Sequence, residues 1–195
     1  AAAWRATGFP GARGIATIGR IRPEKGTDRF VGAMLELLPA HPDVTALVIG
    51  RAARSDTAFL GALRSQIAAA GLQDRILFPG EVAPDALPQL MRALSAVVQL
   101  PRYEGYGMTP LEGMASGVPF VATDQGYYRG FAGQETCGLI THETGAAQAL
   151  HRLLSEPARH EAMARAARAA AETHFSIARE VDGIARVYES LWSEA

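Results

Sequence analysis

Cysteine, net charge and long apolar runs are all scarce in this sequence of 195 residues. The single cysteine, Cys137, cannot form a disulfide within the chain and is compatible with a reducing compartment. The 19 basic and 20 acidic residues leave a net charge of −1, so no basic surplus indicates nucleic acid as a partner. No stretch is long and apolar enough to form a transmembrane segment. With 48% apolar and 20% charged residues, the chain has the composition of one globular domain with a full core.

Several motifs of enzyme chemistry are also missing. The histidines form no metal-ligand spacing with cysteine and no Asp-x-Asp motif occurs, so the sequence predicts no metal site. There is no Gly-x-Ser-x-Gly elbow of the kind that carries a serine nucleophile. The loop after the first expected strand lacks Gly-x-Gly-x-x-Gly, which argues against a dinucleotide oxidoreductase.

What the sequence does contain is a regular alternation of apolar strands and helices. Strands are expected at residues 14–19, 44–50, 75–78, 96–100, 118–123 and 137–140, with a glycine-rich loop at 124–133. Helices are expected at residues 29–38, 56–70 and 85–94, and in three pieces from residue 144 onwards. Thr27 or Asp28 is expected to cap the first helix, and Asp85 the third. This alternation predicts an α/β fold with a doubly wound parallel sheet covered on both faces.

The stretch from Arg102 to Gly117 has the features of a ligand-binding loop. It follows the strand at 96–100 and opens a short helix, and α/β proteins bind ligands at such strand ends. Gly105 and Gly107 let the backbone turn sharply and approach a ligand closely. The unpaired amides of the first helical turn suit a phosphate or a sugar hydroxyl. Glu104 and Glu112, eight positions apart, add two acceptors that are expected to face the same volume.

Both glutamates also have a structural interpretation. Thr109-x-x-Glu112, with Pro110 at the first helical position, has the form of a capping box. Glu104, just before a glycine turn, has the simpler interpretation of an exposed loop acid. Taken residue by residue, the sequence leaves both interpretations open.

The whole string from Glu104 to Pro119 resembles the Glu-x7-Glu signature of retaining GT-B glycosyltransferases of family four. The usual form reads Glu-Gly-Phe-Gly, then Leu-Glu-Ala-Met-Ala, then Gly-x-Pro. Tyr106 stands in place of Phe and Gly113 in place of Ala, and neither change removes a functional group. Within that family, the sequence is most similar in appearance to lipopolysaccharide core mannosyltransferases.

A basic loop after the first strand supports the resemblance. Arg20 and Lys25 lie where the edge of the sheet binds ligands, so the two cations could hold a diphosphate. By themselves they have the simpler interpretation of solvated surface cations. Gly19-Arg20, followed after four residues by Lys25-Gly26, matches the phosphate-clamping pattern of the family in type and spacing, so the resemblance favours the clamp.

The resemblance implies the C-terminal, donor-binding half of a GT-B fold, a Rossmann-like domain that transfers a hexose from a nucleoside diphosphate sugar. GDP-mannose is the favoured donor, with retention of configuration and with no essential metal or other cofactor. Glu104, Arg20 and Lys25 are the expected catalytic residues. The expected donor-binding residues are Gly19, Arg20, Lys25, Arg51, Pro79, Val82, Glu104, Gly105, Tyr106, Gly107, Met108, Thr109 and Glu112.

Each of these groups has an expected role under the resemblance. Glu104 is expected to accept hydrogen bonds from the donor hexose, and Glu112 from the ribose hydroxyls. Arg51 and the segment from Pro79 to Val82 follow the second and third strands, where main-chain contacts to the base are expected.

The resemblance also bears on how the chain is organised. Residues 1–12 are expected to be an interdomain leader and residues 13–175 the nucleotide-sugar-binding domain. Residues 176–195 are expected to form a helix that crosses toward an absent N-terminal domain, which would bind a glycan or glycolipid acceptor. Most apolar residues of that helix are expected to pack on the domain's own sheet, whereas Tyr188 to Trp192 are expected to be exposed.

The abrupt start at Ala-Ala-Ala-Trp is typical of a cut inside a longer protein. The isolated domain is therefore expected to bind nucleotide but to turn over poorly or not at all. The full-length protein is expected to be cytoplasmic, and peripheral binding to the inner face of the membrane is compatible with this expectation.

Other functions remain open at this point. One is a non-catalytic nucleotide-sugar sensor or regulatory module with the same donor pocket. Another is a GT-B enzyme of a different class, such as an epimerase or phosphorylase. A further one is another GT-B enzyme that uses a UDP-sugar. A Rossmann dehydrogenase is a more distant alternative, and the sequence fixes neither the sugar, the base nor the acceptor.

Overall fold

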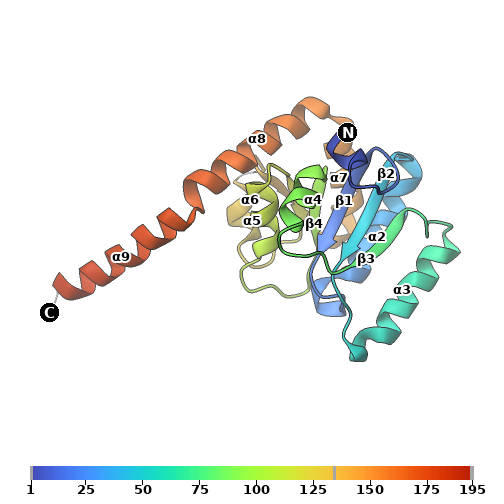
Figure 1. The fold of residues 1–195 in the computed structure, drawn as a ribbon, viewed down its shortest axis with the longest axis horizontal. Coiled ribbons are helices and arrows are strands. Elements are labelled where there is room, and N and C mark those ends of the chain that lie inside the picture. Colours follow the sequence, from blue (N-terminus) through green and yellow to red (C-terminus); the bar gives the residue numbers. More distant parts are fainter. Residues whose placement is uncertain (1, 134, 194–195) are drawn as a thin grey trace.

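The computed structural model describes residues 2–133 and 135–193, and its centre is one parallel sheet (Figure 1). The strands are β1 (Arg13–Ile18), β2 (Val44–Ile49), β3 (Ile76–Gly80), β4 (Ala96–Gln99), β5 (Phe120–Ala122) and β6 (Gly138–Ile140). Their order in the sheet is β3-β2-β1-β4-β5-β6, and all neighbouring strands run parallel. The predicted α/β, doubly wound fold is therefore confirmed.

Strand β2 shows why the apolar runs form the middle of the sheet. All six of its residues are buried, and it pairs along its full length with β1, for example Ile15 with Ala46. A strand covered on both faces needs apolar side chains on both, so it has a continuous rather than an alternating pattern.

Helices cover both faces of the sheet. The α-helices of the described residues are α1 (Ala2–Arg5), α2 (Thr27–Leu37), α3 (Thr57–Ala69), α4 (Leu87–Ala93), α5 (Met108–Ala115), α6 (Tyr128–Ala132), α7 (Ala146–Ser155), α8 (Pro157–His174) and α9 (Ile177–Ser193), and α9 is the one that does not cover the sheet. One buried cluster joins the sheet to α2, α3 and α7, and includes Phe30 and Leu150. The other joins it to α1, α4, α5, α6 and α8, and includes Met114 and Phe120. The two clusters form one core on each side of the sheet.

The helices begin at different residues from those predicted. Gly26, Ala86 and Gly107 are the N-cap residues of α2, α4 and α5, and no side chain forms a cap hydrogen bond there, so the expected caps at Thr27 or Asp28, Asp85 and Thr109 are wrong. The reason at α2 and α5 is a left-handed glycine, with φ of 68° at Gly26 and 103° at Gly107. Such a residue turns the chain into the helix earlier than a Ser, Thr or Asp cap would. Helix α6 also falls within the segment that was expected to be a loop.

The N-terminal residues pack on the domain. Trp4 is 1% exposed, and its indole nitrogen donates to the carbonyl of Pro10 at 2.9 Å. Helix α1 lies against α4 and contributes Trp4 to the buried cluster on that side of the sheet. The expected leader at 1–12 thus supplies core contacts to this domain.

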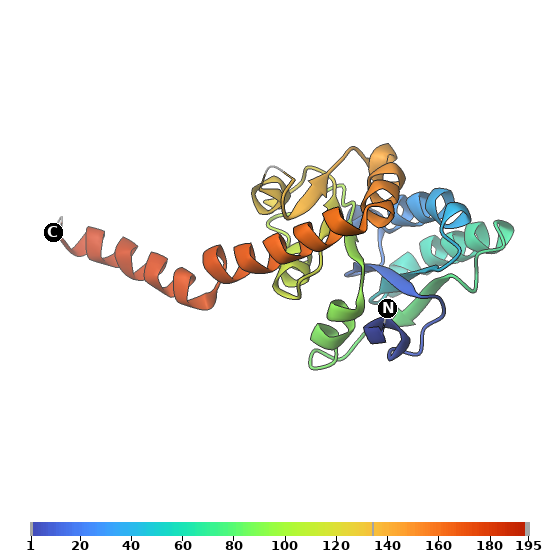
Figure 2. The ribbon, with the colours of Figure 1, turned by 90° about the horizontal axis from the view of Figure 1, so that it is seen from above.

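At the other end of the chain, α9 leaves the body of the molecule. Figures 1 and 2 show α8 running along the domain and α9 continuing away from it. Seven large apolar side chains of α9, which we call the α9 stripe, are 52–81% exposed: Ile177, Val181, Ile184, Val187, Tyr188, Leu191 and Trp192. The expectation that most of them pack on the domain's own sheet is wrong, and the expected exposure of Tyr188 to Trp192 is observed. No helix in the described ranges is long and apolar enough to span a membrane.

Candidate functional site

The candidate site lies where β1 and β4 are neighbours in the sheet. The chain continues from β1 to β2 on one side and from β4 to β5 on the other, so the strand order reverses at this point. A crevice outside the carboxyl ends of the strands at such a reversal is where open α/β sheets bind ligands. The two segments that leave these strands are the basic loop (residues 19–26) and the glutamate loop (residues 100–107).

An ion pair joins the two loops. The Lys25 ammonium donates to the Glu104 carboxylate, with an Nζ–Oε2 distance of 2.8 Å, although the residues are 79 positions apart in the sequence. The side chains are 30% and 18% exposed, so the pair lies partly below the surface. The other carboxylate oxygen of Glu104 accepts the amide hydrogen of Gly105 at 3.1 Å. The structure thus brings together two residues that the sequence singled out separately.

Tyr128 approaches the same carboxylate from inside the domain. Its hydroxyl lies 3.5 Å from Glu104 Oε2, and its side chain is 1% exposed. Burial, with the nearby charge of Glu104, raises the pKa of the phenol far above its usual value, so Tyr128 stays a hydrogen-bond donor. Sequence analysis missed this residue because α6 is only five residues long, although the aromatic spacing of Tyr127, Tyr128 and Phe131 was a signal for a helical turn.

A second connection between the loops was also missed. The Arg102 guanidinium holds the Asp28 carboxylate through two bonds of 2.8 and 2.6 Å, and the Arg102 amide donates to the Glu24 carbonyl at 2.9 Å. The hydrogen bond from Arg102 keeps the pKa of Asp28 below its usual value, and the same bond raises the pKa of Arg102. Nothing local in the sequence links the two residues, because Asp28 lies in the first turn of α2 and Arg102 follows β4.

Glycines allow the loops to approach closely. A side chain at Gly26 would place its Cβ 1.8 Å from the Leu100 carbonyl oxygen, and one at Gly107 would place it 1.9 Å from the Tyr128 ring. The basic loop therefore packs on the glutamate loop, and the glutamate loop on α6, only because neither glycine has a side chain.

The remaining predicted residues lie along the same edge of the sheet. Arg20 is exposed in the basic loop after Gly19, and it forms no hydrogen bond or ion pair within residues 2–133 and 135–193. Arg51 is 77% exposed and lies 3.7 Å from the Glu81 carboxylate, Pro79 is exposed, and Val82 is half-buried. No hydrogen bond within the described ranges joins Arg51, Pro79 or Val82 to the Lys25–Glu104 pair.

Helix α5 opens toward the site without a side-chain cap. Tyr106 and Met108 are 46% and 56% exposed, and the Thr109 hydroxyl lies 3.5 Å from the Ile18 carbonyl instead of closing a capping box. Glu112 falls in the second turn of α5 and is exposed, so the capping-box interpretation of Glu112 is wrong. The first-turn amides of α5 keep their partial positive charge available at this end.

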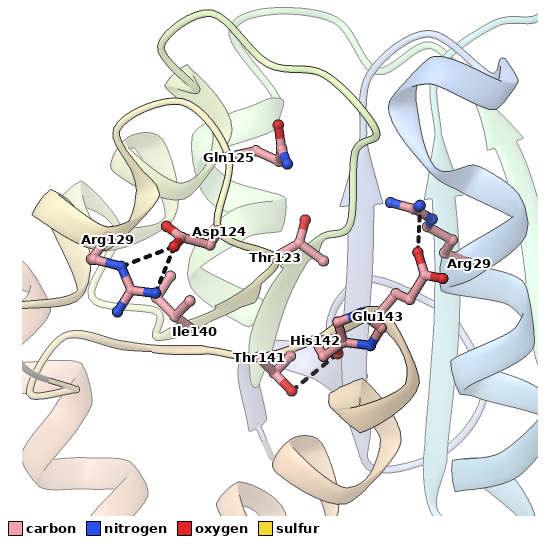
Figure 3. Close-up of a pocket in the computed structure, with 9 residues that line it drawn as sticks. All are labelled: Arg29, Thr123, Asp124, Gln125, Arg129, Ile140, Thr141, His142 and Glu143. Atoms are coloured by element: carbon pink, nitrogen blue, oxygen red, sulfur yellow. Dashed lines mark hydrogen bonds and ion pairs between the residues drawn. The ribbon is translucent and has the colours of Figure 1, made fainter.

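A hollow of about 420 Å³ lies beside the glutamate loop, at the ends of β5 and β6 (Figure 3). Its lining residues are Arg29, Thr123, Asp124, Gln125, Arg129, Ile140, Thr141, His142 and Glu143. Its charges are already matched, because Arg129 pairs with Asp124 at 2.6 Å and Arg29 pairs with Glu143. We therefore place the candidate site at the Lys25–Glu104 pair, where the exposed Arg20 adds a cation that pairs with no acid of residues 2–133 and 135–193.

The side chains of the site can bind two kinds of chemical group. Arg20, Lys25 and the amides that start α5 are donors with positive charge, which suits an anionic group such as a phosphate. Glu104 is an acceptor at the same place, which suits a hydroxyl-rich group next to that anion. In the described ranges, no group of three or more His, Cys, Asp or Glu side chains could hold a metal ion.

Comparison with known proteins gives a consistent picture. The model of the family "Glycosyl transferases group 1" matches residues 7–170. The chain is 42% identical over 189 residues to the lipopolysaccharide core biosynthesis mannosyltransferase LpcC of Rhizobium leguminosarum bv. viciae, covering 95% of this chain and 53% of that protein. The chain thus spans about half the length of this curated relative.

Two solved structures extend the comparison to the fold. The C-terminal domain of the glycosyl transferase group 1 family protein LpcC from Francisella tularensis matches with a TM-score of 0.86 and 32% identity, covering 90% of this chain and 92% of that chain. Anabaena HepE, in complex with UDP and glucose, matches with a TM-score of 0.86 and 25% identity, covering 95% of this chain and 50% of that chain.

Proposed function

This chain belongs to the glycosyl transferases group 1 family, and from that premise we propose that it binds a nucleoside diphosphate sugar as the donor half of a hexosyltransferase. The observation that carries the proposal is the Lys25–Glu104 pair at the strand reversal, 2.8 Å between Nζ and Oε2. One side chain suits a diphosphate and the other a sugar hydroxyl. A donor that contains both groups, side by side, fits this arrangement.

In the proposed mechanism, the chain stabilises the departing nucleoside diphosphate. Negative charge develops on the diphosphate as the bond to the hexose breaks, and Arg20, Lys25 and the first amides of α5 lie ready to stabilise it. These fixed cations supply the charge that a metal ion supplies in other transferases, so no metal is required. Glu104 accepts hydrogen bonds from the hexose and sets its geometry, and Glu112 accepts from the ribose.

We propose GDP-mannose as the donor and retention of configuration at the transferred sugar. The mannosyltransferase LpcC of Rhizobium leguminosarum, 42% identical over 189 residues, supports mannose. The acceptor is proposed to be a glycan or a lipopolysaccharide core, bound by a part of the full-length protein that precedes this domain. A UDP-sugar is the second candidate donor, because Anabaena HepE binds UDP and glucose with the same fold.

A thermal-shift screen of the chain with GDP, GDP-mannose, UDP and UDP-glucose tests the proposal. A ligand that binds only the folded chain stabilises it by about 2.7 kcal/mol when present at a hundred times its dissociation constant. We expect GDP-mannose to raise the unfolding temperature most. Stabilisation by UDP-glucose that equals or exceeds that by GDP-mannose would overturn the choice of donor. No stabilisation by any of the four would overturn nucleotide-sugar binding itself.

A further inference from the structure

Within residues 2–133 and 135–193, the Glu104 carboxylate has three hydrogen-bond partners, which differ in how firmly each is held. Lys25 Nζ lies at 2.8 Å, the Gly105 amide at 3.1 Å and the Tyr128 hydroxyl at 3.5 Å. Each partner comes from a different part of the site: the basic loop, the glutamate loop itself and α6. The role of each depends on whether it can keep its place when a donor binds.

Two of the partners cannot fix Glu104 during binding. Lys25 is 30% exposed and is also the cation that a diphosphate attracts, so the donor competes with Glu104 for it. The Gly105 amide belongs to the next residue, so it moves together with Glu104 and ties the carboxylate to nothing outside the loop. A carboxylate held by these two alone would lose its orientation as the diphosphate arrives.

Tyr128 differs from both. Its side chain is 1% exposed, its ring lies against Gly107 and 6.5 Å from the ring of Phe120, and it is anchored in α6. At 1% exposure, Tyr128 has almost no surface that a ligand could contact, whereas Lys25 is open to one. A phenol is protonated near neutral pH, and burial raises the pKa of Tyr128 further, so its hydroxyl can donate to the carboxylate there.

We propose that Tyr128 is the positioning residue that keeps Glu104 directed at the donor hexose when the diphosphate takes Lys25. This inference rests on the proposed function, since it assigns Tyr128 a part in binding the sugar of the same donor. The close contact of its ring with Gly107 sets the distance between α6 and the glutamate loop. This contact thereby places the Tyr128 hydroxyl next to the Glu104 carboxylate, 3.5 Å from Oε2.

The test is calorimetric titration of the 195-residue chain with GDP and with GDP-mannose. The variants are Tyr128→Phe, which removes only the hydroxyl, and the control Tyr127→Phe, which removes the hydroxyl of the 48%-exposed residue directly before α6. We expect Tyr128→Phe to bind GDP like the wild type. The ratio of GDP-mannose affinity to GDP affinity should fall roughly tenfold, which corresponds to the low end of the range for a hydrogen bond to a charged group. Tyr127→Phe is expected to bind both ligands like the wild type.

A double-mutant cycle separates positioning from packing. In a Glu104→Ala background the hydroxyl has no carboxylate to orient, so Tyr128→Phe is expected to cause no further loss for GDP-mannose. A full additional loss in that background, or a wild-type ratio of GDP-mannose to GDP affinity in Tyr128→Phe, would overturn this inference alone. A wild-type chain that binds neither nucleotide would overturn the proposed function, and this inference with it.

Discussion

At the scale of single residues, the Lys25–Glu104 pair is more important for placement than for stability. Both side chains are partly solvent-exposed, at 30% and 18%, and such pairs contribute on the order of 0–1 kcal/mol to folding. What the pair does is hold the cation of one loop and the acceptor of another next to each other before any ligand binds.

The first prediction concerns the two glutamates. Glu104→Gln frees Lys25 for the diphosphate, so affinity for GDP should be unchanged or tighter, whereas the gain from the mannose should fall. Glu112→Gln should weaken GDP and GDP-mannose alike, because it removes an acceptor for the ribose. Titration calorimetry of both variants with both ligands measures these changes.

Each assignment can fail separately. If Glu104→Gln loses bare GDP as strongly as GDP-mannose, the hexose role of Glu104 is wrong. If Glu112→Gln binds GDP like the wild type, the ribose role of Glu112 is wrong, and Glu112 is then an exposed residue of α5.

A second prediction concerns the basic loop. Arg20→Ala and Lys25→Ala should each weaken GDP binding by roughly 1.5–3 kcal/mol, the range for hydrogen bonds to charged groups. Arg20→Ala should leave the free energy of unfolding within about 0.5 kcal/mol of the wild type, because the side chain is exposed and outside the core. Titration calorimetry measures the change in GDP affinity, and chemical denaturation measures the free energy of unfolding. The exposed Arg54 serves as a control, and GDP affinity at wild-type level in both loop variants would leave them as surface cations.

A third prediction concerns pH and the buried His41 at the opposite edge of the sheet. Its Nε2 lies 2.9 Å from His151 Nδ1, and its Nδ1 lies 3.5 Å from an Arg13 nitrogen. Since Arg13 can only donate, His41 Nδ1 is the acceptor and the ring is neutral. Burial first, then the charge of Arg13, lowers the pKa of His41 below its usual value.

The sign of the effect follows from proton binding. Below the unfolded pKa of about 6.5, the unfolded chain takes up a proton at His41 that the folded chain does not. The contribution of His41 to the free energy of unfolding should therefore be complete above pH 6.5. As the pH falls below 6.5, the free energy of unfolding should decrease by at most about 1.4 kcal/mol per pH unit. Urea denaturation at pH 7.5, 6.5 and 5.5 checks this. His41→Gln should flatten the slope, while the exposed His174→Gln should keep it; equal slopes in the two variants would contradict the prediction.

At the scale of elements, the Arg102–Asp28 contact joins the start of α2 to the glutamate loop. The planar guanidinium bonds both carboxylate oxygens, at 2.8 and 2.6 Å, a geometry that a lysine cannot reproduce. Because α2 begins at Thr27, directly after the basic loop, the contact also holds Lys25 in place relative to Glu104.

The fourth prediction follows from this contact. Arg102→Lys should lower GDP affinity by about threefold or more, because small displacements of binding groups are costly, and should lower stability by roughly 1 kcal/mol or less. Calorimetry and denaturation measure both. Arg129→Lys is the control, since Arg129 forms a similar pair with Asp124 that joins neither loop to α2. An equal effect of the two variants on GDP affinity would mean that the contact does not position the site.

At the scale of the whole molecule, the α9 stripe is the feature that the domain leaves without a covering surface. Its seven side chains, 52–81% exposed, lie on a helix that projects from the body (Figure 2). An exposed apolar surface of this kind marks an interaction site. We propose that another part of the full-length protein covers it.

The fifth prediction tests that proposal. In this chain, Leu191→Glu should change the free energy of unfolding by less than about 0.5 kcal/mol, because Leu191 is already 62% exposed. In the full-length protein, the same change should cost about 2 kcal/mol, the value of burying a leucine. Asp182→Asn, on the same helix, should have little effect in either form. A small effect of Leu191→Glu in both forms would show that the stripe stays uncovered.

The fold class and the separate parts of the site could be predicted from the amino-acid sequence. Apolar runs at the strands, broken by glycine and proline, required a parallel sheet with helices on both faces, and the strings around Lys25 and Glu104 marked two loops at its carboxyl edge. These features depend on residues close together in the chain, so local patterns were enough to predict them.

How these parts meet could not be predicted from the sequence, because it depends on the three-dimensional arrangement of the strands. The contacts of Glu104 with Lys25 and Tyr128, and of Arg102 with Asp28, join segments that the strand order brings together, and no local pattern specifies a pairing across 79 or 74 positions. The helix starts at Gly26 and Gly107 depend on left-handed backbone angles that close packing of the loops imposes. The direction of α9 has the same kind of cause: its amphipathic spacing predicted a helix, but whether a surface covers that helix depends on what the rest of the molecule places beside it.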